Sequence, residues 1–248
     1  MHAFSRTEML LGKEGLAVLG ESKVAIFGVG GVGTYVAEAL IRAGIGSLVL
    51  VDDDTICLTN TNRQLHTLRS TIGRSKVEAM RDRLVEINPE IKQEFYLPEN
   101  ADSLMSDDYS YIVDALDTVS AKIDLVLQGQ VRNIPVISAM GAGNKLDPTK
   151  IKQTDVFKTK TCPLAKVMRK ELRKRGIKKL KVVYSEEEPI KPKQTEENSC
   201  QSNCICPSGS VQHCLVKRAV PGSISYVPGI VGLMIAGTVV NDLLKSTK

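Results

Sequence analysis

Short hydrophobic runs alternate with longer amphipathic stretches along residues 1–145. A run of this kind predicts a buried strand, and a stretch with apolar residues every three or four positions predicts a helix. Strands are expected at 23–27, 47–52, 92–97, 111–117 and 134–141, and helices after the glycine turn to about Ala43, at 76–88 and at 121–133. This alternation predicts an α/β fold with a doubly wound, Rossmann-like, mostly parallel sheet.

The pattern changes after about residue 145. Two predicted strands at 150–157 and 180–186 flank a helix at 163–176, a polar loop covers 186–203, and an apolar helix closes the chain. We therefore expect a nucleotide-binding core with an N-terminal arm over 1–145. The remainder, 146–248, is expected as an extension of mixed strands and helices that packs on this core.

Composition changes this picture little. Of the 248 residues 42% are hydrophobic, but Trp is absent and aromatic residues make up only 4%, so aliphatic side chains fill the core, as in helices packed on parallel strands. The apolar run at 224–240 is interrupted by Pro228 and several small residues. It is shorter than the roughly 20 residues of a membrane span. A buried core helix is the favoured interpretation, with peripheral membrane contact as the alternative.

Charge is concentrated in one segment. The formal net charge is +5, but residues 158–181 hold eleven Lys or Arg and one acid, Glu171, a local charge of +10. Such asymmetry indicates contact with a polyanion, and phosphate contacts position RNA without reading its sequence. A solvated helix face is the alternative. The cations are Lys158, Lys160, Lys166, Arg169, Lys170, Arg173, Lys174, Arg175, Lys178, Lys179 and Lys181.

The turn GVGGVG follows the first predicted strand and precedes the first predicted helix. Gly28, Gly30 and Gly33 have the G-x-G-x-x-G spacing, with Gly31 added. Glycines in this context allow a tight turn, a close approach of phosphate to the backbone, and close packing of helix on strand. The motif predicts a nucleotide site, and a tight turn without a ligand is the alternative.

Polar residues after the second strand suggest that the nucleotide is a reactant. Asp52 ends that strand, where a carboxylate accepts hydrogen bonds from ribose hydroxyls. Two nearby cations, Arg63 and Lys76, suit a triphosphate attacked at its α-phosphorus, because charge then builds on the leaving pyrophosphate. They argue against an NAD(P)-dependent oxidoreductase. The other polar side chains of this stretch are Asp54, Asn60, Asn62 and Gln64.

Asp117 ends the strand expected at 111–117, at the edge where such sheets place catalytic groups. A carboxylate there suits Mg²⁺, which prefers oxygen ligands and shares them with phosphates. Asp114 is the competing acid, but strand alternation favours a structural role for it.

The segments LVDDDTICLTNTNRQ, GRSK and DALDT, with the glycine turn, resemble the adenylyltransferases that activate ubiquitin-like and sulfur-carrier proteins. The branch of tRNA threonylcarbamoyladenosine dehydratases is more similar still. The resemblance to this branch covers Arg6 to about Leu244 and includes NTNRQLHTLRSTIGRSKVEAMRDRLVEINPE, YSYIVDALDTV, IPVISAMGAGNKLDPTKIKQTDVFKT, PLAKVMRKELRKRGI and PGSISYVPGIVGLMIAG.

The resemblance implies roles for individual residues. Asp52 would hold the ribose and Asp117 would bind Mg²⁺, while ATP's phosphates would be contacted by Asn60, Arg63 and Lys76. Arg6 matches an N-terminal arginine that reaches into the partner subunit's site, which implies a homodimer and an arginine-finger role. A solvated terminal charge is the alternative for Arg6.

The resemblance also implies a reaction. The carboxylate of threonylcarbamoyladenosine, next to the tRNA anticodon, would receive AMP from ATP, and a nucleophile of the same group would then close a ring and release AMP. Proximity within one small group assists the second step. The alternatives are adenylation of a ubiquitin-like or sulfur-carrier protein's C-terminus, with a different acceptor, and a non-catalytic RNA-binding scaffold.

Six cysteines and no recognisable signal peptide predict a reducing, cytoplasmic location. Cys162 in KTCPLAK is a candidate acyl acceptor, but a structural role is favoured because a reactive thiol needs a lowered pKa. Cys57 is expected as buried packing. A sulfur-relay partner and a Zn²⁺ site are further possibilities that the sequence leaves open. The candidate zinc ligands are Cys200, Cys204, Cys206 and Cys214, with His213 as a spare.

Overall fold

The computed structural model describes residues 1–96, 104–193, 195 and 221–246. A single seven-stranded sheet runs through this part of the chain, in the order β3-β2-β1-β4-β5-β7-β6. All neighbouring strands are parallel except β6, which is antiparallel to β7. The strands are β1 (Lys23–Phe27), β2 (Ser47–Val51), β3 (Lys92–Tyr96), β4 (Tyr111–Asp114), β5 (Val136–Ala139), β6 (Ile151–Asp155) and β7 (Lys181–Ser185).

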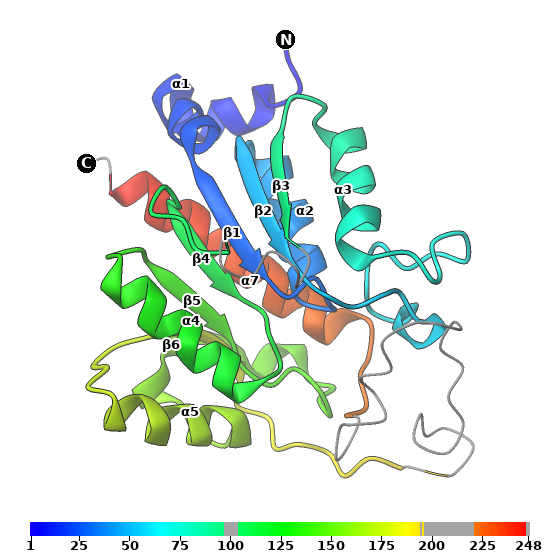
Figure 1. The fold of residues 1–248 in the computed structure, drawn as a ribbon, viewed down its shortest axis with the longest axis vertical. Helices are drawn as coiled ribbons and strands as arrows, with labels where there is room; N and C mark the ends of the chain where they lie inside the picture. The colour runs from blue at the N-terminus through cyan, green and yellow to red at the C-terminus, as the bar shows by residue number, and fades with distance from the viewer. Residues whose placement is uncertain (97–103, 194, 196–220, 247–248) are drawn as a thin grey trace.

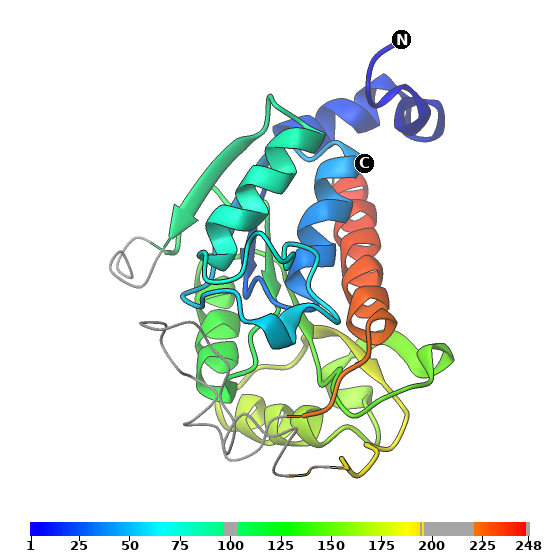
Figure 2. The same ribbon diagram turned by 90° about the vertical axis from the view of Figure 1, so that its right-hand side faces the viewer.

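Helices cover both faces of the sheet, which confirms the predicted doubly wound fold (Figure 1). One face carries α2 and α7, which lie side by side in Figure 2, together with α3, and the other carries α4 and α5. The helices are α1 (Ser5–Glu21), α2 (Gly33–Ala43), α3 (Lys76–Ile87), α4 (Val119–Val131), α5 (Pro163–Lys174) and α7 (Tyr226–Lys245), with 3-10 turns η1 (Leu58–Asn60), η3 (Pro148–Lys150) and η4 (Val156–Lys158).

Strand alternation explains how the two helical layers share the core. In β1, Val24 and Ile26 pack in the cluster that includes α2 and α7, whereas Ala25 and Phe27 pack on the opposite face with Leu125 of α4. Successive side chains of a strand point to opposite faces, so a strand covered on both sides must be apolar throughout. All four residues are buried, as the continuous hydrophobic run at 24–27 within the predicted strand indicated.

The C-terminal part shares the sheet of the N-terminal part. β7 pairs with β5 over Ile137–Ala139, and β6 adds the edge strand beyond it. Residues 146–185 therefore extend the same sheet, and α7 returns across it to pack on α2 and β5.

Three expectations about local structure differ from the observed fold. Helix α1 was not predicted. Its hydrophobic pattern is weak, and Gly12, with φ of 74°, breaks its helical geometry midway. The strand expected at 111–117 ends at Asp114, whose carboxylate accepts from the N–H of Leu116 at 3.1 Å and so turns the chain. Cys57 is only half-buried, since the preceding Ile56 occupies the buried position of that turn.

Helix α7 is long and apolar enough to cross a membrane by length and composition alone. Half of its most apolar window is nevertheless buried within the fold. Gly232 allows a close approach to α2, because an added Cβ there would lie 2.6 Å from the carbonyl oxygen of Val32. This packing supports the predicted core helix.

Candidate active site

The glycine turn lies at the carboxyl end of β1 and leads into α2. Gly28 has φ of 92°, and an added Cβ on Gly33 would lie 1.8 Å from the Gly28 carbonyl oxygen. Only glycine fits both positions. Within the described part of the chain no acceptor is recorded for the backbone N–H groups of Gly30, Gly31 and Val32. Three available donors before a helix N-terminus form a site suited to phosphate.

Asp52 follows β2 directly and supports this turn. One oxygen of its carboxylate accepts a hydrogen bond from the N–H of Val29 at 2.6 Å, and the other accepts one from the N–H of Asp54 at 2.9 Å. Burial raises the pKa of Asp52, and the nearby Lys76 cation opposes that shift. Each oxygen retains a lone pair for a ribose hydroxyl. The predicted ribose ligand is therefore positioned at the glycine turn.

Lys76 starts α3 and lies almost completely buried beside the aspartates. Its Nζ donates to the carboxylate of Asp54 and lies 3.6 Å from an oxygen of Asp52. The N–H of Lys76 is bonded to the Asp54 carbonyl, which fixes the start of α3 against this loop. A buried ammonium at the same edge as the free amide donors would stabilise a phosphate chain electrostatically.

The loop between β2 and α3 brings Arg63 onto the glycine turn. The side-chain carbons of Arg63 lie against Gly31, where an added Cβ would approach them to 3.2 Å. Its guanidinium donates to the carbonyl of Thr59 at 3.1 Å and to the side-chain oxygen of Asn62 at 2.9 Å. The amide of Asn62 in turn donates to the carbonyl of Ser223, just before α7.

Asn60 and Gln64 differ in how far their side chains are engaged. The amide oxygen of Asn60 accepts from the N–H of Cys57 at 3.0 Å and so caps η1. Gln64 is buried against Gly30, and its Oε1 has no hydrogen-bond partner among the described residues. A buried amide oxygen without a partner carries a free-energy cost, which a donor group of a bound molecule would relieve.

His66 is a buried residue of this site that the sequence analysis did not identify. Its Nε2 lies 2.9 Å from the carbonyl oxygen of Val29, and its Nδ1 lies 3.3 Å from the hydroxyl of Thr67. Burial is the main cause that lowers the pKa of His66 to about 4. A single histidine in NRQLH gives no motif by itself, so only the fold reveals this contact.

The two candidate acids of the β4–α4 connection occupy different environments. Asp114 is fully buried and pairs with the equally buried Lys122 at 3.0 Å, while it also accepts from the Ser138 hydroxyl. Asp117 lies past the strand end, three positions after Asp114, and is exposed. Its carboxylate accepts from the hydroxyl of Thr118 at 3.4 Å. Of the two, only Asp117 is accessible to a metal ion or substrate.

Comparison with known proteins identifies the family of this chain. The sequence model of the ThiF family matches residues 4–248. The chain belongs to the ThiF family. It is 43% identical to the tRNA threonylcarbamoyladenosine dehydratase of Bacillus subtilis, over 99% of this chain and 96% of that protein. It is 36% identical to the enzyme of that name from Haemophilus influenzae, over 94% and 89% of the two chains.

A solved structure of a relative shows the same fold. The E. coli tRNA N6-threonylcarbamoyladenosine dehydratase, crystallised in complex with ATP, superposes with a TM-score of 0.81 at 32% identity. The match covers 98% of this chain and 94% of that one. This ThiF-family chain is therefore similar in fold and in sequence to proteins that have one enzyme name.

Arg6 lies away from the glycine turn of its own chain. It is exposed near the start of α1, and α1 leads into the amino end of β1, so the helix lies at the edge of the sheet opposite the turn (Figure 1). Figure 2 shows α1 projecting from the main body of the fold. Arg6 therefore does not complete the site of its own subunit.

Two of the six cysteines, Cys57 and Cys162, lie in the part of the chain that the structure describes. Cys162 is buried at the start of α5, with its sulfur close to Gly141, so its thiol is not accessible to an acyl group in this structure. Cys57 accepts a hydrogen bond from Thr59 at 3.2 Å. The proposed zinc ligands Cys200, Cys204, Cys206 and Cys214, and the spare His213, lie outside the described residues.

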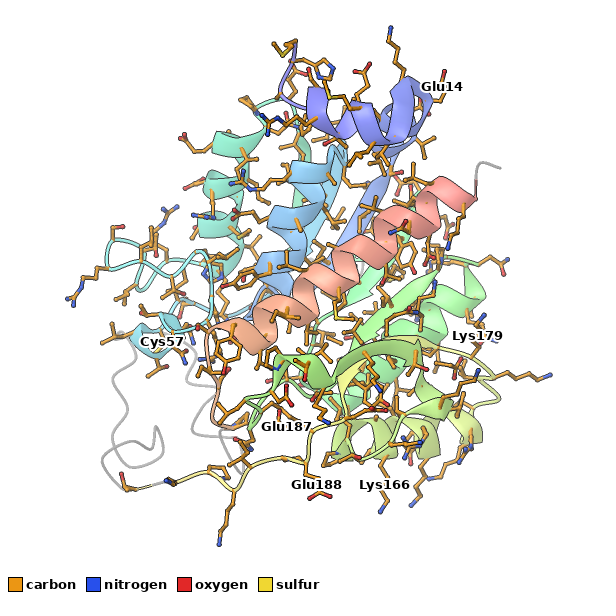
Figure 3. All side chains as sticks on the ribbon, turned by 180° about the vertical axis from the view of Figure 1, so that it is seen from behind. Glu14, Cys57, Lys166, Lys179, Glu187 and Glu188 are labelled. Atoms are coloured by element: carbon orange, nitrogen blue, oxygen red, sulfur yellow. The ribbon has the colours of Figure 1, made fainter. Side chains whose placement is uncertain are left out.

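The basic segment has an inner and an outer set of cations. Arg169 donates to the Thr159 carbonyl, Lys174 and Arg175 pair with Glu171 at 2.8 Å, and Lys181 pairs with Asp242. In Figure 3, the labelled Lys166 and Lys179 point outward. Nine cations of this segment are exposed, including Lys174 and Arg175, the two partners of Glu171. We call the seven others the outer basic face. They are Lys158, Lys160, Lys166, Lys170, Arg173, Lys178 and Lys179.

Proposed function

We propose that this chain is an ATP-dependent tRNA threonylcarbamoyladenosine dehydratase that works through an adenylate. The observation that supports it most is a grouping at one sheet edge. It consists of the glycine-turn amides that have no acceptor among the described residues, the Asp52 carboxylate and the buried Lys76 ammonium. This set suits ribose and phosphates together. This grouping does not specify which molecule accepts AMP. We take the tRNA substrate of the proposal from the enzyme name of the relatives.

In the first step, an oxygen of the threonylcarbamoyl carboxylate attacks the α-phosphorus of ATP. A mixed anhydride with AMP forms and the bond to pyrophosphate breaks. The leaving group gains negative charge, so cations held beside it lower the barrier. Lys76 is already fixed at this edge, and Arg63 lies on Gly31. Asn60 and Gln64 add side-chain amides at the same loop.

In the second step, a nucleophile of the same threonylcarbamoyl group attacks the activated carbonyl carbon. The ring closes and AMP leaves with the former carboxylate oxygen. Over both steps the threonylcarbamoyl group loses the atoms of one water molecule. Because nucleophile and electrophile belong to one group, proximity replaces an enzyme nucleophile. A buried Cys162 is consistent with this route, since no thioester is needed.

Mg²⁺ is the metal that fits the exposed acid at this edge. Asp117 offers carboxylate oxygens, which Mg²⁺ prefers and which it shares with phosphates. Bound there, Mg²⁺ would neutralise charge on the ATP phosphates. Asp114 is unsuited to this role because Lys122 and Ser138 already occupy its oxygens.

The tRNA is expected on the outer basic face. Cys162, at the start of α5, lies near Gly141 after the carboxyl end of β5, so α5 runs from the edge that holds the glycine turn toward the opposite edge. Its length of 12 residues corresponds to about 18 Å at 1.5 Å per residue. Cations along this path would hold phosphates while the modified base enters the site.

A homodimer would place Arg6 in the site of the partner subunit. Two neighbouring residues of α1, Met9 and Leu10, are 81% and 86% exposed, and Leu233 of α7 is 53% exposed. Exposed apolar side chains of this size on α1 and α7 favour contact with another protein surface. We expect a second copy of the chain to cover these side chains. We also propose a cytoplasmic location, and a sulfur-relay partner remains a separate hypothesis.

A direct assay tests the proposal. The protein is incubated with labelled ATP and either tRNA bearing threonylcarbamoyladenosine or a sulfur-carrier protein with a free C-terminus. AMP release that depends on the modified tRNA, with a mass loss of one water in the nucleoside, supports the proposal. AMP release that depends only on the carrier protein supports the alternative adenylyltransferase, and NADH binding without ATP binding contradicts both.

The outer basic face has its own matched control. Lys170→Glu reverses one exposed charge on α5, whereas Lys13→Glu reverses an exposed charge on α1. We expect weaker tRNA binding and a smaller salt dependence only for Lys170→Glu, because each phosphate contact contributes to the salt slope. Equal tRNA affinity of both variants would exclude this face.

A further inference from the structure

We propose that His66 is a positioning residue for the nucleotide, which directs the Gly30 amide toward the phosphates. This inference rests on the proposed function only in that ATP is the ligand. Four consecutive residues connect the loop to the turn. Arg63 lies on Gly31, Gln64 on Gly30, Leu65 donates to the Thr34 hydroxyl, and His66 contacts the Val29 carbonyl.

The tautomer of His66 follows from its partners. A carbonyl oxygen only accepts, so the Nε2 that lies 2.9 Å from the Val29 oxygen must carry the proton. In the neutral ring Nδ1 is then an acceptor, and the Thr67 hydroxyl at 3.3 Å is its donor. The Thr71 hydroxyl donates to the His66 carbonyl at 2.6 Å, which fixes the backbone below the ring.

Val29 is held on both sides by this arrangement. Its N–H donates to Asp52 at 2.6 Å and its carbonyl accepts from His66 at 2.9 Å. The two contacts fix the peptide planes before and after the Val29 Cα. In a planar trans peptide the carbonyl and the following N–H point in opposite directions. His66 draws the Val29 carbonyl inward, so the Gly30 N–H must point away from the ring.

The Gly30 N–H is one of the donors without an acceptor in the described structure. Its direction therefore depends on a histidine that does not itself touch the phosphates. A ring that is almost fully buried has little freedom to move, so the donor is oriented before the nucleotide binds. Such preorganisation favours binding, because less conformational entropy is lost when the nucleotide binds.

The test compares His66→Gln, His66→Asn and wild type in the full chain. The amide nitrogen of Gln reaches about as far as Nε2, whereas that of Asn reaches only as far as Nδ1. We expect about tenfold weaker ATP binding for Asn, the effect of one neutral hydrogen bond, and near wild-type binding for Gln. Thr71→Val is the matched control, because it removes a hydrogen bond to the His66 backbone and leaves the ring contact.

Kinetics separate positioning from a general structural role. Misorienting a donor that binds the ground state and the transition state equally raises KM for ATP and leaves kcat unchanged. A loss of folded enzyme lowers kcat and leaves KM unchanged. Equal ATP affinity of the Gln and Asn variants overturns the inference, as does a fall in kcat alone. Wild-type protein that binds ATP but ignores modified tRNA contradicts the proposed function and leaves the His66 comparison valid, whereas wild type without ATP binding overturns both.

Discussion

Acidification should destabilise this protein through His66. The folded state holds the ring neutral, with the pKa lowered from its ordinary value of 6.5 to about 4 because of burial. The unfolded chain takes up a proton near the ordinary value. Between these two pH values the unfolded state binds more protons, so the free energy of unfolding falls as pH falls. The contribution is fully present above pH 6.5 and is lost by about pH 4.

The size of the effect follows from the pKa difference. One unit corresponds to about 1.4 kcal/mol, so the fall of the pKa from 6.5 to about 4 corresponds to roughly 3 kcal/mol over the whole range. Between pH 7 and pH 5 the expected loss is about 2 kcal/mol, because the unfolded chain is almost fully protonated at the lower value. A loss of this size is a substantial part of the roughly 5–15 kcal/mol that stabilises a typical domain.

Urea unfolding of wild type and His66→Gln at pH 7 and pH 5 isolates this contribution. Carboxylates such as Asp52 titrate in both proteins, so their effects cancel in the difference between the two pH dependences. Gln does not titrate, so the variant should lose about 2 kcal/mol less than wild type over this interval. Equal losses in both proteins, within about 0.5 kcal/mol, would refute a neutral buried imidazole.

Four further predictions concern the core and the site. Lys122→Met leaves the buried Asp114 without its cation and should reduce the free energy of unfolding by about 3–5 kcal/mol; a loss under about 1 kcal/mol contradicts this. Gly33→Ala should abolish ATP binding measured by calorimetry, because its Cβ would lie 1.8 Å from the Gly28 oxygen, whereas Gly20→Ala meets no atom within 4 Å and should bind normally. Lys76→Met removes the ammonium that would stabilise charge on the leaving pyrophosphate, so AMP release should slow about a hundredfold. Lys150→Met is the control, and equal rates of AMP release in the two variants exclude a role for Lys76. Asp117→Ala should keep tRNA affinity in filter binding but lose turnover, and unchanged turnover would remove Asp117 from the mechanism.

The order of strands and helices in the Rossmann-like core was readable from the sequence because its signals are local. Residues 24–27 are apolar at every position, since helices cover both faces of β1. The glycine spacing predicted the turn because Gly28 and Gly33 meet backbone atoms at distances that exclude a Cβ. The position of Asp52 after β2 likewise followed from chain order alone.

Other features depend on contacts between distant parts of the chain. The sequence did not show that the eleven cations of 158–181 divide into an inner and an outer set, because Asp242 and Thr159 select Lys181 and Arg169. Helix α1 escaped prediction because its glycines weaken the helical pattern and packing against α7 stabilises it instead.

The sequence alone determined the α/β pattern, the glycine turn and the set of polar residues available to a nucleotide, because these depend on spacing along the chain. Only the tertiary structure decided which of those residues face one another. Strand alternation already favoured a structural role for Asp114, but only the fold supplied its buried partner Lys122 and brought His66 to Val29 across 37 positions of chain. Burial and hydrogen-bond partners assign such roles, and neither is defined until the chain has folded.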